Sequence, residues 1–520
     1  MEHMKRFLLA LASVSKGRAL VFLSLMLCQI SYAQQISGNV TDATGEAIIG
    51  ATVMEKGTSN GTVTDFDGNF TLKVASGKTL VITYVGFQPL EETAKNGMKV
   101  VLQEDALALN EVVVTGYTTQ RKADLTGAIS TVSVDELAKQ NENNPIKALQ
   151  GRVPGMNITP DGGSPSGKAA VRIRGVGTMN AGADPLYIID GVPTTAGMHE
   201  LNGNDIESIQ VLKDASSASI YGSRAANGVI IITTKKGKEG KVKVDFDASV
   251  AVQTYAHKID VLNAKQFGEV MWQGYVNDGL NPNTNGLGYS YDWSYNPQGY
   301  PVLNKITMAK YLDAAGTTPS ADTDWFDQTT RTGVIHQYNV SLSNGSERGS
   351  SFFSLGYYKN NGIIKYTDFE RFSGRMNTEY KLVKVGDRNI VTIGEHFTLN
   401  RTSEVEAPGG FIENVLQFNP SLPVYTTKGD FAGPEGGYAD RENPLARLER
   451  NKDNRYTFWR MFGDAYVNIN PIKNLNIKTT FGLDYSQKEQ RRFVYPITEG
   501  TVANPTNAVE PKQEHWTKWM

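Results

Sequence analysis

The second half of the sequence is written in long alternating segments, and this pattern limits the fold more than any other feature. Even positions from Val242 to Val252 are apolar, while the odd positions between them are mostly polar. A period of two is that of a β-strand with one apolar face. The same pattern recurs near 336–344, 350–360, 371–382, 390–400, 456–469 and 475–485. The sequence therefore predicts seven strands of about 9 to 14 residues, the length that crosses an outer membrane when tilted.

The connections between these strands alternate in length. Short connections fall at 345–349, 383–389 and 470–473, whereas those at 255–335, 361–370 and 401–455 are longer. Transmembrane barrels show this alternation, with short turns in the periplasm and longer loops outside. A second exported β-sandwich is the alternative for the same strands. The barrel interpretation places 255–335 outside the cell.

The first 33 residues are typical of an export signal. Basic residues precede an apolar stretch at 19–30, and Ser31-Tyr32-Ala33 offers the small residues that signal peptidase requires. The stretch is too short to span a bilayer as a helix, and no later apolar run reaches that length. Cys28, the single cysteine, lies in this segment. We expect an exported protein whose mature form has no cysteine.

Two further domains are predicted between the export signal and the long strands. Residues 36–103 read as short strands between regularly spaced turns, the pattern of a small β-sandwich. Residues 124–238 mix a helix at 135–149 with several short strands, which favours a compact α+β domain. The predicted fold class is therefore mainly β: a sandwich, an α+β domain and the first strands of an antiparallel transmembrane barrel.

A run of three valines lies between these two domains. Asn110-Glu111-Val112-Val113-Val114-Thr115-Gly116 has strong β propensity but is closely bounded, so it predicts one short strand without an obvious hairpin partner. Two interpretations stay open. The strand belongs to a neighbouring domain, or it pairs with the sheet edge of another protein by β-augmentation.

The sequence offers no catalytic, metal or cofactor site. Its 52 basic and 54 acidic residues give a net charge of -2, which excludes binding to nucleic acid through bulk charge. The six histidines are scattered without the spacing of a metal pair. Residues 162–169 resemble a phosphate-binding loop, but Ala169 replaces the magnesium-binding hydroxyl and a strand pattern follows. We expect no enzyme activity.

Aromatic residues alternate with polar ones in the first long connection. Tyr289, Tyr291, Trp293 and Tyr295 could stack on sugar rings or anchor a partner protein. Alternatively they pack the loop on the barrel rim or form an interfacial belt. The pattern alone leaves both open.

Together these segments resemble the SusC-type TonB-dependent outer-membrane transporters. The most specific similarities are Pro185-Leu186-Tyr187-Ile188-Ile189-Asp190-Gly191-Val192-Pro193 and the string from Val211 to Gly222, which are similar to the family's plug domain. The resemblance implies a carboxypeptidase-regulatory-like extension at 36–103, a TonB box at 109–117, a plug at 120–236 and a partial barrel at 240–520. It assigns TonB binding to Glu111, Val112, Val113, Val114, Thr115 and Gly116.

The resemblance also implies a function. It predicts TonB-dependent import of a glycan or similar oligomer, with peptide as another substrate class, through the outer membrane and together with a SusD-like surface lipoprotein. The alternatives are a surface receptor or adhesin that binds without transport, and a non-functional truncated transporter. Seven strands is an odd number, and a plugged transporter needs about 22. We therefore expect this sequence to be an N-terminal portion of such a barrel.

Overall fold

The computed structural model describes residues 34–520 except 59, 76, 85–86, 104–111, 116–117, 122–128, 134–143, 163, 178–181, 195–196, 215–217, 387, 434–440, 474, 500–501 and 520. The predicted export signal lies outside the described residues. The chain divides into two compact units, residues 1–126 and 127–520, and each is described by itself.

The first unit is the predicted β-sandwich. One sheet has the order β4 (Asn69–Val74), β1 (Gln34–Thr41) and β7 (Met98–Val101). The second has the order β3 (Gly61–Val63), β2 (Thr52–Glu55), β5 (Thr79–Thr83) and β6 (Leu90–Thr93). Side chains alternate strictly between exposed and buried along β4, which gives one apolar face to the core. That core includes Ile36, Val53, Phe70, Leu80 and Ile82.

The valine run forms β8 (Val112–Thr115), in the same unit. It pairs antiparallel with β9 (Thr118–Arg121), with Thr115 opposite Thr118. The prediction of a strand is confirmed, but the expectation that it lacks a local partner is wrong. Thr118 and Thr119 are β-branched and follow after only two residues, which allows a hairpin. Glu111 and Gly116 lie outside the described residues.

The second unit begins with an α+β domain, which we call the plug domain (residues 129–234). Its main sheet has the order β10 (Ile129–Ser133), β15 (Ile206–Leu212), β16 (Val229–Thr234), β13 (Leu186–Ile189) and β14 (Val192–Thr194). A hairpin of β11 (Met156–Pro160) and β12 (Ala169–Ile173) accompanies it. Short 3-10 helices η3 (Lys147–Leu149), η4 (Met198–Glu200), η5 (Gly203–Asp205) and η6 (Ser219–Ala225) connect the strands. Most of the helix predicted over 135–149 lies outside the described residues, and its end forms η3.

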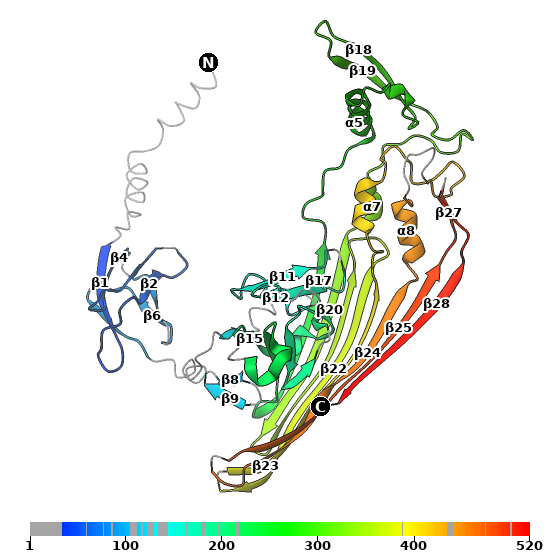
Figure 1. Cartoon of the computed structure of the whole chain (residues 1–520). Coiled ribbons are helices and arrows are strands. Elements are labelled where there is room, and N and C mark those ends of the chain that lie inside the picture. Colours follow the sequence, from blue (N-terminus) through cyan, green and yellow to red (C-terminus); the bar gives the residue numbers. More distant parts are fainter. Residues whose placement is uncertain are drawn as a thin grey trace, which may run out of the picture. The chain divides into compact units, whose positions relative to one another are not determined.

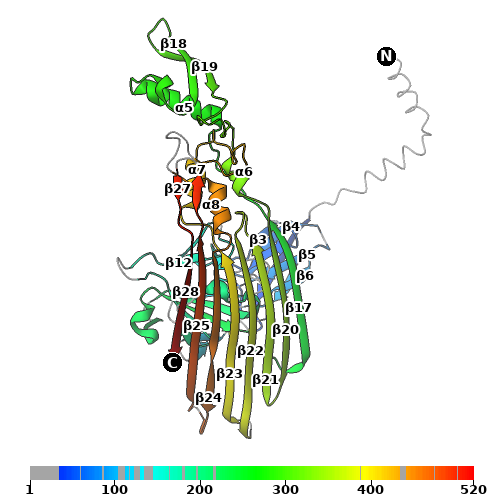
Figure 2. The ribbon, with the colours of Figure 1, turned by 90° about the vertical axis from the view of Figure 1, so that its right-hand side faces the viewer.

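Eight long strands, which we call the strand wall, follow the plug domain (Figures 1 and 2). They are β17 (Gly240–Gln253), β20 (Gly333–Ser346), β21 (Gly349–Asn361), β22 (Asp368–Val385), β23 (Arg388–Val405), β24 (Arg455–Ile469), β25 (Ile477–Val494) and β28 (Ala508–Trp519). Each pairs antiparallel with the next in this order. The seven predicted strands are confirmed. The count of seven is wrong, because β28 is an eighth strand. Its charged residues lie on one face, but Pro511, Gln513, His515 and Thr517 interrupt the apolar pattern of the other face and hide the alternation.

The alternation of connections is also confirmed. Short turns join β20 to β21, β22 to β23 and β24 to β25 at one end of the wall. At the other end the first long connection carries α5 (Ala264–Asn277), η7 (Pro282–Thr284), β18 (Tyr289–Tyr295), β19 (Pro301–Met308) and α6 (Trp325–Thr329). Later connections carry α7 (Phe411–Gln417), α8 (Pro444–Asn451) and the hairpin of β26 (Ile497–Glu499) with β27 (Val502–Asn504). No helix in the described part of the chain is long and apolar enough to cross a membrane.

Candidate functional site

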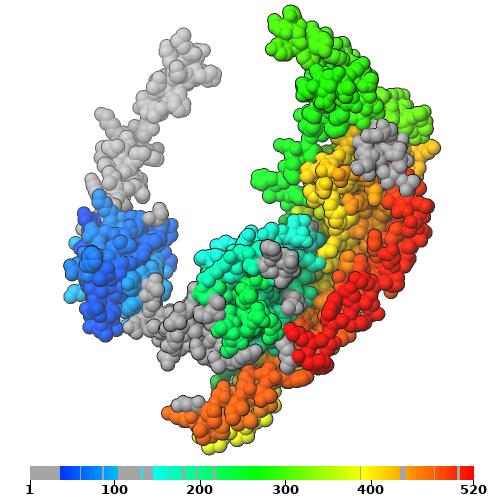
Figure 3. Space-filling model, in the orientation of Figure 1, coloured from blue at the N-terminus to red at the C-terminus, as the bar shows by residue number. Residues whose placement is uncertain are grey.

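The two faces of the strand wall differ sharply in polarity. Residues two apart on a strand share a face. On β22 the buried positions are Phe369, Arg371, Ser373, Arg375 and Asn377, four of them polar, and Arg371 and Asn377 donate hydrogen bonds to the plug domain. The alternate positions, such as Phe372, Met376 and Tyr380, are apolar and exposed. The plug domain therefore lies against the polar, inner face of the wall (Figures 1 and 3).

Asp190 joins three parts of this unit. It lies in the turn between β13 and β14, with a φ of 50° that the following Gly191 continues at 92°. One carboxylate oxygen accepts the Thr234 N–H at 3.0 Å, and the other accepts the Thr234 hydroxyl at 2.8 Å and pairs with Arg375 of β22. Burial alone would raise the pKa of Asp190, but the Arg375 guanidinium, the nearby His396 and the two hydrogen bonds from Thr234 together outweigh burial and hold the pKa below its ordinary value.

Asn377 of β22 holds the C-terminal end of the plug domain at the same place. Asn377 donates to the Thr234 hydroxyl at 2.9 Å and to the Lys235 carbonyl at 2.7 Å. Thr234 ends β16, and β17 begins only six residues later at Gly240. Asp190, Arg375 and Asn377 thus hold the plug domain to the wall close to the segment that links them.

A second buried cluster surrounds Arg460 of β24. Its guanidinium contacts Glu200 of the plug domain at 3.2 Å, Asp484 of β25 at 2.9 Å and the Thr194 hydroxyl at 2.6 Å. One cation thus serves two carboxylates. Burial raises the pKa of Glu200 to about 7, although Arg460 opposes the shift.

Most of the remaining contacts between plug domain and wall are also polar, although the Phe369 ring of β22 packs against His199. Lys168 pairs with Glu404 at 2.8 Å and with Glu406 at 2.5 Å. Four wall side chains donate to the plug domain or share a hydrogen bond with it: Arg371 to the carbonyls of His199 and Leu201, Ser354 to Asp205, Asn360 to the carbonyl of Pro165, and Asn339 with Asn202. Among the described residues, Phe462 is the one wall side chain in the buried apolar cluster of the plug domain.

Two polar side chains approach the backbone closely at Gly356 of β21. A Cβ atom there would lie 2.6 Å from the Ser373 hydroxyl and 2.7 Å from the Asn202 amide nitrogen. Both distances are too short for a carbon atom. Gly356 therefore lets the plug domain sit against the wall at this point.

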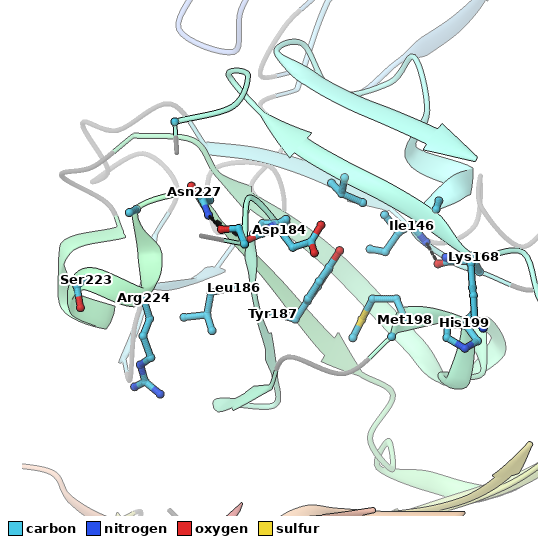
Figure 4. Close-up of a pocket in the computed structure, with 18 residues that line it drawn as sticks. Ile146, Lys168, Asp184, Leu186, Tyr187, Met198, His199, Ser223, Arg224 and Asn227 are labelled. Carbon is cyan, nitrogen blue, oxygen red and sulfur yellow. Dashed lines mark hydrogen bonds between the residues drawn. The ribbon is translucent and has the colours of Figure 1, made fainter. Parts of the chain in front are cut away.

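The plug domain also contains a cavity of about 650 Å³ (Figure 4). Tyr187, Met198 and His199 line it, and Asp184 and Asn227 contribute polar groups. Burial raises the pKa of Tyr187 and lowers that of His199 to about 3, so both side chains are neutral at pH 7. A cavity of this size means that the plug domain is less closely packed here than in its sheet.

The four aromatic residues predicted as contacts lie together on β18, but at different depths. Tyr289 and Tyr291 are buried, and their hydroxyls donate to the carbonyls of Ala264 at 2.7 Å and Gly268 at 3.0 Å in α5. Their rings pack the hairpin on that helix. Trp293 is half-buried and Tyr295 is exposed, with ring centroids 5.3 Å apart. Only these last two present a surface to a ligand or partner.

The residues that join the plug domain to the wall were not predicted as site residues. Asp190 and Glu200 contact side chains 185 and 260 positions later in the sequence. The sequence does contain a signal for these contacts. Arg371, Arg375 and Asn377 share one face of an alternating strand, and such a polar face could have been predicted to contact another polar part of the protein.

Comparisons with known proteins agree with this architecture. The family described as TonB-dependent Receptor Plug Domain matches residues 121–229, and the CarboxypepD_reg-like domain matches residues 36–114. The TonB-dependent receptor SusC of Bacteroides thetaiotaomicron is 33% identical over 503 residues, which cover 90% of this chain and 46% of that protein. The TonB-dependent receptor P26 of Formosa agariphila is 33% identical over 90% of this chain and 44% of its own.

A solved structure shows the same fold. The RagAB peptide importer in its open-open state superposes with a TM-score of 0.58 at 26% identity, over 78% of this chain and 45% of that chain. The chain spans less than half the length of these relatives. A plug domain against the inner face of a wall of long antiparallel strands defines the class of TonB-dependent receptors. Within this class the chain is SusC-like.

Proposed function

We propose that this chain takes part in TonB-dependent import of an oligomeric nutrient, a glycan or a peptide, across the outer membrane. In this proposal residues 1–33 are an export signal, 36–103 a regulatory-like extension, 109–117 the TonB box, 120–236 the plug and 240–520 part of the barrel. Import against a gradient needs an energy source, and the outer membrane offers no nucleotide. A pull on the plug domain through the TonB box would supply that energy.

The polar contact between plug domain and wall is the observation that carries this proposal. A plug that moves must exchange its contacts with the wall for contacts with water. Hydrogen bonds and ion pairs can be replaced by bonds to water at a small net cost, since an intramolecular hydrogen bond contributes only about 1 kcal/mol. An apolar interface would expose carbon to water at about 25 cal/mol per Å². The wall thus holds the plug domain in one position and still permits its release.

The valine strand supports the same mechanism. β8 is a short strand that pairs on one side with β9 and has one other edge. Adding a strand of TonB to that edge would transmit force through main-chain hydrogen bonds, with little demand on side chains. Val112, Val113, Val114 and Thr115 form the strand, and the proposal extends the contact to Glu111 and Gly116.

The partner and substrate assignments rest on the outer connections. Trp293 and Tyr295 offer adjacent aromatic rings at the end of the β18–β19 hairpin, which could stack on a sugar or anchor a SusD-like lipoprotein. The RagAB structure is named as a peptide importer, and SusC is named only as a receptor. We therefore propose an oligomeric substrate and leave glycan and peptide as two arms of the test.

Deletion of residues 111–116 tests the proposal in cells. Uptake of a labelled oligomer should stop while binding at the cell surface persists, because the deletion leaves the outer connections intact. A matched control replaces Val112, Val113 and Val114 by threonine, which keeps the β propensity of the strand. This control is better than a second deletion of the same length, for example at 94–99, because that deletion would remove Ala94 from the core of the sandwich. Unchanged uptake in the deletion variant would instead favour a surface receptor that binds without transport.

A further inference from the structure

The outward face of the strand wall contains a recess that the proposed import does not use. It has a volume of about 510 Å³ and spans β17 to β24. Its lining is mostly apolar, with Arg401 as its charged residue, and includes Phe246, Tyr338, Leu355, Phe372, Leu399 and Trp459. These side chains occupy outward positions, so the recess opens away from the plug domain.

The strand register orders the outward side chains in three rows. The first of these rows, one step in from the row of Val334 and Asn361, is polar apart from Val250, with His336 opposite Lys359 and Lys359 opposite Glu370. The next row is aromatic: Tyr338, Tyr357, Phe372, Arg401 and Trp459 are successive cross-strand partners. The third row is aliphatic except for Phe246 and Gly374, in the order Phe246, Val340, Leu355, Gly374 and Leu399. This sequence of polar, aromatic and aliphatic rows is that of a membrane interface.

The recess lies in the third row because Gly374 has no side chain there. A Cβ atom there would meet one atom within 4 Å, the Leu355 Cδ2 at 3.6 Å, so the space above Gly374 is open. Neighbouring outward positions carry large side chains. An apolar gap between large side chains at this depth matches a hydrocarbon chain better than a polar ligand.

Arg401 lies at the polar end of the recess. Its guanidinium is 5.7 Å from the Trp459 ring and 3.8 Å from Oε2 of Glu370, whose other carboxylate oxygen, Oε1, accepts the Tyr357 hydroxyl at 2.9 Å. The side chain is 34% exposed, and its ion pair is longer than a hydrogen bond. Arg401 thus has N–H donors to offer, and a guanidinium binds phosphate in a bidentate manner. Lys359, opposite Glu370 in the strand register, adds a second positive charge to the same face of the wall.

We propose that this recess binds one phosphorylated lipid of the outer leaflet, with an acyl chain above Gly374 and the phosphate at Arg401. The inference rests on the proposed outer-membrane location but not on transport. All lining residues belong to strands of one continuous sheet, so the site is complete within this part of the chain. A bound lipid would fix the wall at the level where its long connections begin.

Retention of defined lipids by the purified protein tests this proposal. Protein extracted from outer membranes is exchanged into a neutral detergent. It is then incubated separately with three probes: phosphatidic acid, diacylglycerol with the same acyl chains, and inorganic phosphate. Native mass spectrometry measures how much of each probe stays bound. Phosphatidic acid should remain bound at least about tenfold more than either other probe, because diacylglycerol lacks the phosphate contact and inorganic phosphate lacks the buried acyl chain. Equal retention of phosphatidic acid and diacylglycerol would overturn the proposal, as would a mass showing a second copy of the chain in place of lipid.

Variants separate the two parts of the site. Gly374→Leu fills the recess and should lower retention of phosphatidic acid about tenfold, whereas Met376→Leu, two residues further along the same face, should not. Arg401→Gln should abolish the preference for phosphate, whereas Arg388→Gln at the opposite end of β23 should leave it unchanged. Heat-dependent gel mobility checks folding, and Gly374→Ala serves if the leucine variant does not fold. Unchanged retention in a folded Gly374 variant would overturn the proposal, and the uptake test with residues 111–116 deleted is independent of this result.

Discussion

Arg460 of the strand wall and Glu200 of the plug domain meet at 3.2 Å, with both side chains buried. The same guanidinium also binds Asp484 at 2.9 Å, so the cluster holds one more carboxylate than it has cations. Burial raises the pKa of Glu200 to about 7. Glu200 is therefore the residue through which this contact responds to pH.

We predict that the contact becomes less stable as pH rises from about 4.5 to about 7. In the folded protein Glu200 keeps its proton up to about pH 7, whereas the ordinary pKa of a glutamate is 4.5. The folded state binds more protons in this window, so its stability is greatest below the window and is lost as pH rises through it. Glu200→Gln should remove this part of the pH dependence, because the amide is neutral and its oxygen still accepts from Arg460.

The midpoint of thermal unfolding, measured across the same pH range, checks the prediction. Asp184→Asn is a matched control, because Asp184 is an exposed carboxylate of the same domain paired with Arg172. That control should keep the slope of the wild-type protein. An identical slope in Glu200→Gln and wild type would show that Glu200 does not titrate in this window.

Arg375→Met should destabilise the contact strongly at neutral pH. The substitution leaves Asp190 buried without its guanidinium, which costs about 3 to 5 kcal/mol. Because the folded pKa of Asp190 is lowered, the stabilisation is present at neutral pH and is lost as pH falls through that pKa. Urea unfolding measures the effect. The double variant Arg375→Met with Asp190→Asn should recover part of the loss, and strictly additive effects would contradict a direct pair.

Backbone changes in β8 should affect uptake more than side-chain changes do. Replacing Val113 and Val114 together by proline removes two N–H donors, one at each edge of the strand, and should abolish uptake. Replacing both by threonine keeps the donors and the β propensity, and uptake should persist. Uptake of a labelled oligomer measures both variants. Wild-type uptake in the proline variant would argue against strand pairing with TonB.

The buried tyrosines of β18 should contribute to stability rather than to binding. Tyr289→Phe and Tyr291→Phe each remove one buried hydrogen bond to α5 and should cost about 1 kcal/mol. Faster hydrogen exchange in residues 264–308 would report this loss. Tyr295→Ala should leave exchange in the hairpin unchanged, because this side chain is 65% exposed. Protection that falls equally in all three variants would contradict the assignment.

The long strands could be predicted from the sequence because one face of each is polar and the other apolar. The period-two pattern from Val242 to Val252 reports that difference directly. In β28 the rule has less to act on, because the charged residues share one face with Ala508 and Trp516, while Pro511, Gln513, His515 and Thr517 break up the other face. The partner of β8 was also missed, because hairpin signals depend on turn residues and Gly116-Tyr117 is not one of the strong pairs.

The depth of a side chain could not be predicted in the same way. Tyr289 and Tyr295 share a strand and a face, yet α5 covers the first and not the second. Which of them is buried depends on a helix that begins 25 residues earlier. The contacts of Asp190 and Glu200 need the whole wall to be in place, so no local pattern reveals them.

The connections at the two ends of the wall differ in length, and this difference decides which parts of the sequence can gain or lose residues. A turn of two residues, such as Glu347-Arg348 between β20 and β21, sets the pairing of the strands it joins, and one inserted residue would turn an entire face around. The connections that carry α5, α7 and α8 have no such effect on register and can gain or lose whole elements. Evolution can therefore rebuild the end of this wall that carries the long connections while the strands and their contacts with the plug domain stay the same.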